Sequence, residues 1–414
     1  MVKHVHSSVH QHERKVPRLY VGLLAILTML GTDIYLPALG EIRSDLSTSV
    51  FLVGFSLTVY AGGSLVTQLL YGPVSDVLGR KPILLFGLTV FVASTIGCMS
   101  AHDVRIFLAF RFFQAFGACA TTVLWQPIVT DVYSDDEHKV RGIFGFVMSF
   151  VGISPALAPF IGGGIAGLAG WRYTFAALLV LGIGLLVWTA IRFHETLTRD
   201  DARPQCLTFG ALYRPYAILL HDSRFYLYGL SVAAAVGGYM AYLTAAPFAL
   251  ARLGLPPVLI GLSFLPLAGL FGHGGAAAKL LVGRFCEDTA LRIGGAVGLA
   301  GGLLFWLSIE SGFATSAIRY AAPFGLVTFG IGITIPTGSA AVIARFSKIS
   351  GACSSAANCM NSLAVLVSTS AMSLLYQSSG NRLLGAILSA SALLSLVCAL
   401  MLGSKSVTAG RTAC

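Results

Sequence analysis

One carboxylate lies inside an apolar stretch that is long enough to cross a lipid bilayer. The residue is Asp33, and the stretch runs from Leu19 to Leu39. An ionisable group at that depth costs roughly 3 kcal/mol to insert, so such groups generally mark functional sites. The chemistry available to Asp33 is the uptake and release of a proton. The alternative is a carboxyl that is held neutral or paired for packing alone.

A second charged residue, Arg111, lies in the apolar stretch Leu108–Ala118. A buried guanidinium needs partners for its charge and its N–H groups. If Arg18 marks the inner boundary, Asp33 lies about 22 Å along its span, and Arg111 lies about 9 Å inward from Arg105. In a hydrocarbon core of about 30 Å the two charges reach a similar depth, so they form a candidate proton-coupling pair. Whether they face each other is left open, and a purely structural Arg111 is the alternative.

The chain that positions these charges is strongly apolar. It has 414 residues, of which 56% are hydrophobic and 11% charged, and its mean hydropathy is +0.81. This composition excludes a soluble core and predicts an all-α integral membrane protein with twelve transmembrane helices in two six-helix bundles. The predicted spans are 18–39, 48–72, 82–100, 105–130, 141–165, 171–192, 222–248, 258–282, 290–309, 318–342, 350–376 and 382–403.

The longest connection between predicted spans divides the chain into halves, as in transporters whose two bundles rock around a midplane site. The predicted organisation is a cytoplasmic N-terminal tail at 1–17, a six-helix bundle at 18–192, a central cytoplasmic linker at 193–221, a second six-helix bundle at 222–403 and a cytoplasmic tail at 404–414.

The net charge of +10 is an orientation signal rather than a sign of nucleic-acid binding. Of the 27 Lys and Arg residues, twenty fall on the side of the membrane that holds the N-terminus, and six fall on the opposite side. By the positive-inside rule, this predicts a multi-pass protein of the cytoplasmic (inner) membrane with both termini in the cytoplasm. The first span is preceded by a polar tail and followed by no cleavage pattern, so we expect it to be retained.

The cysteines and histidines indicate no metal site, no disulfide and no cofactor. The eight cysteines lie mostly in spans or cytoplasmic segments without metal-like clustering. His4, His6, His10 and His12 alternate along the N-terminal tail and are able to bind a transition metal. A flexible polar terminus is the more common explanation of such a pattern.

The most specific motif is the loop between the second and third spans, residues 72–82, with the sequence GPVSDVLGRKP. It resembles the signature loop of the major facilitator superfamily, G-x-x-x-D-x-x-G-R-[RK]. The resemblance implies a cluster that latches the cytoplasmic side closed, and Asp131 at the inner end of the fourth span is the expected partner of the loop arginine. The matching residues are Gly72, Asp76, Gly79, Arg80 and Lys81.

Two further segments carry the same resemblance. The sequence around Arg111 is similar to the superfamily's R-x-x-Q-G-x-G-A segment, with Ala115 where glycine is usual. The fifth span resembles the antiporter motif in the variant S-P-x-L-A-P-x-x-G-G, which predicts a kinked and tightly packed helix. Its residues are Gly152, Pro155, Pro159, Gly162 and Gly163.

Together with the sequence TDIYLPAL at residues 32–39, this variant is similar to bicyclomycin-resistance-type drug:proton antiporters. Some members of that family carry a second carboxylate about two turns earlier, where Ala25 and Ile26 stand here. A coupling scheme with two carboxylates in the first span is therefore not expected.

Polar and aromatic residues within the spans are candidates for the substrate cavity, because such groups line midplane sites. Interface anchoring and interhelical hydrogen bonding are the alternatives, and for His273 a packing role is the leading one. The candidates are Tyr35, Gln114, Trp125, Gln126, Tyr239, Tyr242, His273, Asn358 and Asn361.

The resemblance implies a proton-coupled exporter of small amphipathic compounds that works by alternating access with Asp33 as proton carrier. We expect a monomer whose partners are substrate, protons and membrane lipid. An uptake symporter for a nutrient such as an amino acid, a siderophore or metabolite exporter, and a non-transporting membrane sensor are the alternatives. An enzyme is not expected, since no nucleophile–base pair, metal triad or phosphate loop stands out.

Overall fold

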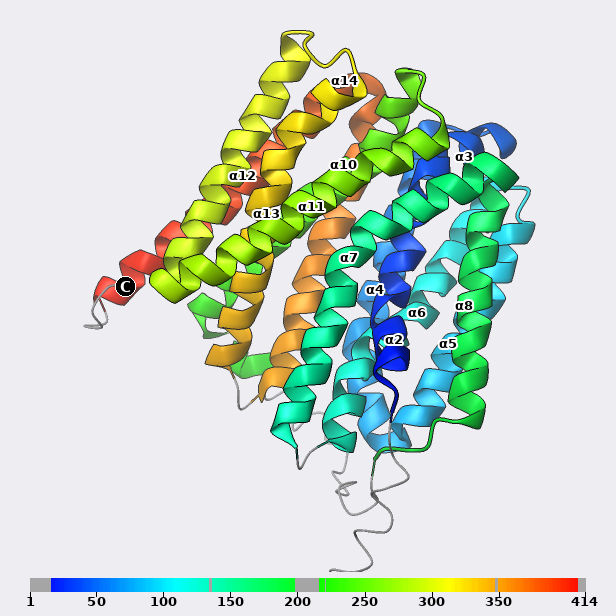
Figure 1. The fold of residues 1–414 in the computed structure, drawn as a ribbon, viewed down its shortest axis with the longest axis vertical. Helices are drawn as coiled ribbons and strands as arrows, with labels where there is room; N and C mark the ends of the chain where they lie inside the picture. The colour runs from blue at the N-terminus through cyan, green and yellow to red at the C-terminus, as the bar shows by residue number, and fades with distance from the viewer. Residues whose placement is uncertain (1–15, 134–135, 198–215, 220, 347–348, 409–414) are drawn as a thin grey trace, which may run out of the picture.

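The computed structural model describes residues 16–133, 136–197, 216–219, 221–346 and 349–408, and its regular structure is helical (Figure 1). The histidines of the N-terminal tail and most of the central linker lie outside these residues. The elements are α2 (Arg18–Asp33), η1 (Leu36–Ala38), α3 (Leu39–Asp45), α4 (Val50–Leu78), α5 (Arg80–Ser100), α6 (Val104–Val132), α7 (Glu137–Ala169), α8 (Trp171–Ile191), α10 (Ser223–Arg252), α11 (Pro257–Arg284), α12 (Glu287–Glu310), α13 (Ala317–Arg345) and α14 (Ser350–Thr408).

Eleven helices in the described part of the chain are long and apolar enough to cross a membrane. The remaining crossing segment is α7, which is 33 residues long and whose described apolar stretch is Leu157–Ala169. Helix α14 contains two crossings, because Gly380 has a φ of 53° and separates two helical pieces. The prediction of an all-α membrane protein with twelve spans in two six-helix bundles is confirmed.

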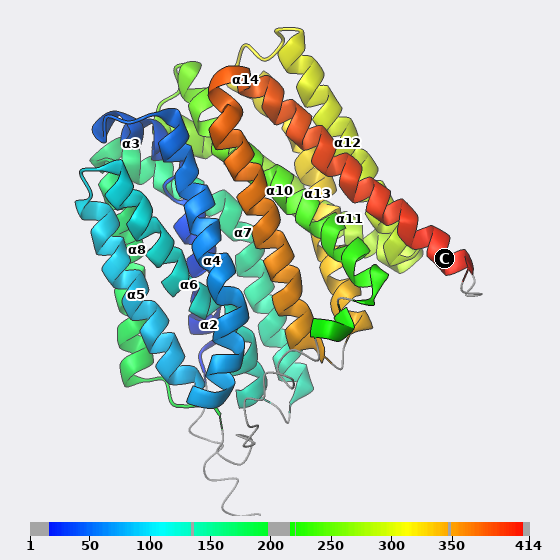
Figure 2. The ribbon, with the colours of Figure 1, turned by 180° about the vertical axis from the view of Figure 1, so that it is seen from behind.

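The two bundles lie side by side, with α2 to α8 in one and α10 to α14 in the other (Figures 1 and 2). The helices alternate in direction, so the connections fall on two opposite faces of the molecule. We call the face with the α4–α5 connection the Gly79 face and the face with the α7–α8 connection the Gly170 face. In both views, α12 and the second half of α14 lean away from the first bundle toward the Gly79 face.

The first crossing is interrupted, whereas the sequence predicts one uninterrupted span at 18–39. Helix α2 ends at Asp33, and after two residues the chain continues as η1 and then α3. Pro37 explains the break, because proline has no N–H to donate to the carbonyl four residues earlier, which is that of Asp33. The carboxyl of Asp33 therefore lies at the end of a helix inside the membrane-spanning region.

The bundles contact each other between the Gly170 face and the level of Gln68. Helix α7 packs on α11, α4 packs on α14, and η1 touches α10 and α11. Two side-chain hydrogen bonds cross the α4–α14 contact: Thr58 and Thr369 are joined at 2.8 Å, and Ser362 donates to Gln68 at 3.1 Å. Small and hydroxyl-bearing residues at this contact let the two backbones approach closely.

The antiporter motif of α7 lies between the helix break and the second bundle. A Cβ on Gly162 would meet the backbone carbonyl of Ile34, the residue after Asp33. A Cβ on the next residue, Gly163, would meet Pro257 and Gly261 of α11. These two glycines thus permit two close contacts at once, one with the broken crossing and one with the other bundle.

This packing predicts different effects on stability for alanine substitutions at Gly162 and Gly164. Gly162→Ala is expected to lower the free energy of unfolding by about 1 to 3 kcal/mol, because its methyl group collides with the Ile34 backbone. Gly164→Ala is the matched control, since no atom lies within 4 Å of its added Cβ, and it is expected to be neutral or slightly stabilising. Melting temperatures of the purified variants test this, and equal melting temperatures would contradict the contact.

Candidate proton and substrate site

Asp33 is buried, with 3% of its surface exposed. Its Oδ1 lies 2.9 Å from the hydroxyl of Thr32, which also lies 2.7 Å from the carbonyl of Met29. Within the described residues no cation forms an ion pair with Asp33. The C-terminal end of α2 adds a partial negative charge at this position. A carboxylate here would therefore be buried without a counter-ion, which is costly in a membrane interior.

Arg111 is completely buried and lies between two aromatic rings. Its guanidinium carbon lies 4.4 Å from the ring centroid of Tyr35 and 4.3 Å from that of Tyr60. Its Nη1 donates to the carbonyl of Gly31 at 2.9 Å and to the side-chain oxygen of Gln114 at 2.5 Å. Cation–π contacts and these hydrogen bonds supply some of the partners that a buried guanidinium requires.

Two of the three nitrogen atoms of the Arg111 guanidinium make no hydrogen bond to the described residues. In the described structure Nε and Nη2 are buried and have no hydrogen-bond partner. The carbonyl that Arg111 binds belongs to Gly31, two residues before Asp33, so both charges lie at the same level of the bundle. They do not form an ion pair in this conformation, and each is available for a new partner.

One aromatic residue of the second bundle approaches this pair. Tyr239 of α10 and Tyr60 of α4 both lie within electrostatic range of Asp33. The hydroxyl of Tyr60 donates to the carbonyl of Thr28 at 3.1 Å. Asp33 is thus flanked by tyrosines from both bundles, at the place where rocking of the bundles would change its surroundings.

The other cavity candidates are dispersed. Gln114 hydrogen-bonds Arg111, and Trp125 packs on Phe144 with ring centroids 4.9 Å apart. Tyr242 is buried in an aromatic cluster of the second bundle and stacks on Phe324 with centroids 3.5 Å apart. The remaining candidates are the half-buried Gln126 and Asn361 and the exposed His273 and Asn358. The structure thus brings Tyr35, Gln114 and Tyr239 to the charged pair, and all nine cavity assignments stay predictions.

His273 does not join the charged pair. Its side chain is exposed on α11, and its Nδ1 lies 2.7 Å from the carbonyl of Gly269 on the preceding turn. A local hydrogen bond of this kind satisfies one ring nitrogen without any contact to another helix. This geometry favours neither the packing alternative nor a cavity position, so both stay predictions.

A cluster of charged residues occupies the Gly79 face, at the start of α5. Arg80 donates through Nε to Asp131 at 3.0 Å and through Nη1 to Ser75 at 2.6 Å, and it also pairs with Asp76. The ion pair between Arg80 and Asp131 is the one expected from the sequence. We call these four residues the Gly79 latch, because Gly79 makes the preceding turn with a φ of 98°, which favours glycine.

Glu195 completes the Gly79 latch and is not among the residues singled out from the sequence. Its carboxylate accepts hydrogen bonds from the backbone N–H groups of Arg80 at 2.9 Å and Lys81 at 3.0 Å. It thereby caps α5, which has no side-chain cap of its own. The ammonium group of Lys81 donates to the carbonyl of Ala190 at the end of α8. The beginning of the central linker is therefore bonded directly to the signature loop.

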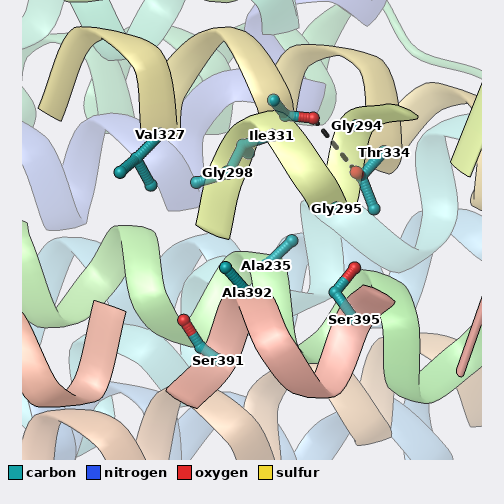
Figure 3. Close-up of a pocket in the computed structure, with 11 residues that line it drawn as sticks. Ala235, Gly294, Gly295, Gly298, Val327, Ile331, Thr334, Ser391, Ala392 and Ser395 are labelled. Carbon is teal, nitrogen blue, oxygen red and sulfur yellow. Dashed lines mark hydrogen bonds between the residues drawn. The ribbon is translucent and has the colours of Figure 1, made fainter. Parts of the chain in front are cut away.

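A small cavity inside the second bundle provides a contrast with the charged site (Figure 3). It lies between α10, α12, α13 and α14 and is lined mainly by glycine and alanine. Thr334 on its wall donates to the carbonyl of Gly330 in its own helix. The cavity presents hydroxyl groups but no ionisable group, so it offers no chemistry for carrying a proton. Its walls comprise Ala235, Gly294, Gly295, Gly298, Val327, Gly330, Ile331, Thr334, Ser391, Ala392 and Ser395.

The family of the chain follows from a match to the model described as Major Facilitator Superfamily, over residues 21–369. The chain belongs to this superfamily. The match includes the helix break at Asp33, the signature loop and the antiporter motif. The family resemblance stated from those motifs is therefore confirmed, and the protein is a multi-pass membrane transporter of this superfamily.

Curated relatives cover most of the chain. An uncharacterised MFS-type transporter, YdgK of Bacillus subtilis, is 34% identical over 68% of this chain and 70% of its own length. A bicyclomycin resistance protein homolog of Haemophilus influenzae is 28% identical over 73% and 76%. Multidrug resistance protein D of Escherichia coli is 27% identical over 94% and 95%.

Among solved structures, a D-xylose–proton symporter superposes with a TM-score of 0.73 at 15% identity. The alignment covers 93% of this chain and 96% of the symporter. At that identity the likeness establishes the fold alone.

The cap on α5 leads to a prediction for Glu195→Gln. An amide has one acceptor oxygen, so it cannot replace a carboxylate whose two oxygens accept from Arg80 and Lys81. The loss is expected to cost about 1 kcal/mol at the start of α5 and to speed hydrogen exchange of the amides at 80 and 81.

The matched control is Asp103→Asn on the Gly170 face, where a single oxygen of Asp103 accepts from the N–H groups of Arg105 and Ile106, so an amide oxygen is able to take its place. Exchange at 80 and 81 is expected to stay unchanged in that variant. Equal exchange in Glu195→Gln and the unaltered protein would show that the linker does not hold the signature loop.

Proposed function

We propose that the protein exports small amphipathic compounds in exchange for protons, with Asp33 as the proton carrier. The observation that carries the proposal is a buried carboxyl at the end of a broken helix, for which the described residues supply no ion-pair partner. At the same level lies a buried guanidinium with two unused N–H-bearing atoms. A carboxyl in this setting has two stable forms. It is neutral when it holds a proton, and it is a carboxylate when a cationic partner replaces that proton.

The names of the curated relatives support export as the direction of transport. Two of the proteins described above are named for resistance to bicyclomycin and for multidrug resistance. The antiporter motif supports the same direction, because its glycines connect the break at Asp33 with the contact between the bundles. Uptake with protons, by a symporter on the same scaffold, is the second candidate, and siderophore or metabolite export is the third.

The proposed cycle uses the described contacts. In the conformation of the structure the bundles meet toward the Gly170 face, so substrate would enter from the Gly79 face. Binding between the bundles displaces the proton from Asp33, and the carboxylate is then able to turn toward the unused N–H groups of Arg111. After the bundles rock, substrate leaves on the Gly170 side and a proton returns to Asp33. Exchange of one neutral substrate for one proton would draw about 2.3 kcal/mol from each 100 mV of membrane potential.

The proposed orientation places the Gly79 face and both termini in the cytoplasm. It is supported by the twenty basic residues that the sequence assigns to that side, against six on the other side. We further propose that the protein resides in the inner membrane of a bacterium and works as a monomer. On this orientation the Gly79 latch lies on the cytoplasmic side and fixes the signature loop within the first bundle.

Replacement of Asp33 by Asn tests the proton carrier. The variant keeps the size and hydrogen-bonding capacity of the side chain but cannot release a proton, so efflux driven by a pH gradient is expected to be lost. The measurement is proton release by purified protein when a panel of neutral and cationic amphipathic compounds is added.

Two comparisons complete the Asp33→Asn test. Glu310→Gln is the control, because Glu310 is an exposed carboxyl in the second bundle whose partner is Arg382, and it is expected to behave like the unaltered protein. Retained proton release together with undiminished gradient-driven export in Asp33→Asn would reject Asp33 as the carrier.

The direction of coupling is tested with proteoliposomes that are loaded with a transported compound. Acidifying the outside drives protons inward, so an antiporter is expected to accelerate exit of the compound, whichever way the molecules are inserted. A symporter would instead slow exit of the compound and favour its uptake. Accelerated uptake under an inward proton gradient would replace the exporter by the second candidate.

A further inference from the structure

A second charged cluster lies on the Gly170 face, at the start of α8. Arg172 donates through Nη1 to Asp45 at 2.5 Å, and the indole N–H of Trp171 donates to the same carboxylate oxygen at 3.1 Å. The guanidinium of Arg172 also lies 4.3 Å from the ring centroid of Trp171. Trp171 is buried, whereas the side chains of Asp45 and Arg172 are partly exposed. We call these three residues the Gly170 latch.

The remaining N–H groups of the Gly170 latch tie three elements together. Arg172 donates through Nε to the carbonyl of Met99 at 3.0 Å and through Nη2 to that of Ala101 at 3.1 Å, at the end of α5. The backbone N–H of Trp171 donates to Glu41 of α3 at 3.2 Å. An exposed ion pair alone contributes little to stability, but this guanidinium binds three acceptors at once in a geometry that lysine cannot reproduce.

The Gly170 latch repeats the construction of the Gly79 latch on the opposite face. The turn before α8 is made by Gly170 with φ 98° and ψ 164°, and the turn before α5 by Gly79 with φ 98° and ψ 156°. Arg80 pairs with Asp131 near the end of the fourth crossing, whereas Arg172 pairs with Asp45 at the end of the first.

The basic residues next to these turns extend the correspondence. Lys81 binds a carbonyl at the end of α8, and Arg172 binds carbonyls at the end of α5. Each helix start is also capped by a glutamate from another element, Glu195 for α5 and Glu41 for α8. The first three crossings thus correspond to the next three in inverted orientation, a relation found in transporters built from inverted repeats.

The segment that the Gly170 latch holds is the one that reaches the second bundle. Asp45 ends α3, which follows η1 after the break at Asp33. Both η1 and α3 contact α10, and η1 also contacts α11. The segment Leu36–Asp45 therefore bridges the bundles on the Gly170 face, and the latch fixes its far end to α8.

We propose that Asp45 and Arg172 are positioning residues that hold the segment Leu36–Asp45 as a lid, which closes the Gly170 face against α10 and α11. The latch fixes the end of the lid at Asp45. At its other end, the lid continues from α2 through the helix break at Pro37. Because the lid is bonded to α5 and α8, it moves with the first bundle when the bundles separate. The proposal concerns closure alone and requires neither a particular substrate nor a proton carrier.

Hydrogen exchange of the full-length protein in lipid nanodiscs tests the lid, with Asp45→Asn compared with the unaltered protein. Exchange in peptides 36–48 and 171–176 is expected to rise by roughly fivefold to thirtyfold, the change that loss of such a contact network produces. The decisive peptide is 248–258, at the junction of α10 and α11 across the bundle contact. Its exchange is expected to rise as well, because a loosened lid no longer covers it.

Two further variants make the result decisive. Glu310→Gln breaks another ion pair of this face, that with Arg382, and is expected to leave all three peptides unchanged. If Asp45→Asn does not fold, Arg172→Lys replaces it, because the ammonium group loses the bonds to the α5 carbonyls. Unchanged exchange at 36–48, or a rise that stops within the first bundle, would overturn the lid. This outcome is independent of the Asp33→Asn result, since no transport is measured.

Discussion

A charge inside the hydrocarbon layer must be neutralised, paired or hydrated, and the arrangement of the first bundle follows from two such charges. Arg111 is satisfied in part by two aromatic rings, a backbone carbonyl and Gln114. Within the part of the chain that the structure describes, Asp33 has only the hydroxyl of Thr32 as a hydrogen-bond partner. This imbalance leaves an acid that is stable when protonated at the same level of the bundle as a guanidinium cation with spare N–H groups, which are suited to bind a carboxylate. The break at Pro37 frees the backbone that such a rearrangement needs.

Packing around the break connects this electrostatic pair with the movement of the bundles. Gly162 and Gly163 are adjacent on α7, yet one faces the backbone of Ile34 and the other faces α11. A shift of α11 relative to α7 therefore changes the packing around Ile34, the residue next to Asp33. The closed packing of protein interiors transmits such displacements, because there is no empty space to absorb them. The contacts at Gly162 and Gly163 therefore connect the position of α11 with the backbone next to Asp33, through close approaches that only glycine allows.

Much of this arrangement was predictable from the sequence, because membrane helices and charges obey strong local rules. The spans follow from hydropathy, and the ion pair between Arg80 and Asp131 follows from the signature loop. Three features were not predictable: the broken first crossing, the cap from Glu195 and the Gly170 latch. Pro37 was visible, but proline is tolerated in many membrane helices. The partners of Glu195 and Arg172 are far away in sequence, so their type and spacing carry no signal until the helices are placed. Ala115, which departs from the family pattern, is buried against Gly63, so the missing glycine on α6 is matched by one on α4.

One latch lies on each face of the first bundle. Each joins the start of one helix to the end of another within the first bundle, so neither has to break when the bundles separate. Each one fixes the connection before its helix through several hydrogen bonds to other elements of the first bundle. On the Gly79 face the rigid element is the signature loop, bonded through Glu195 to the start of the linker. On the Gly170 face it is the lid that continues from the Asp33 break. Asp33 lies three residues before that lid and Asp45 ends it, so the proposed proton carrier and the residue that holds the lid belong to one continuous segment of chain.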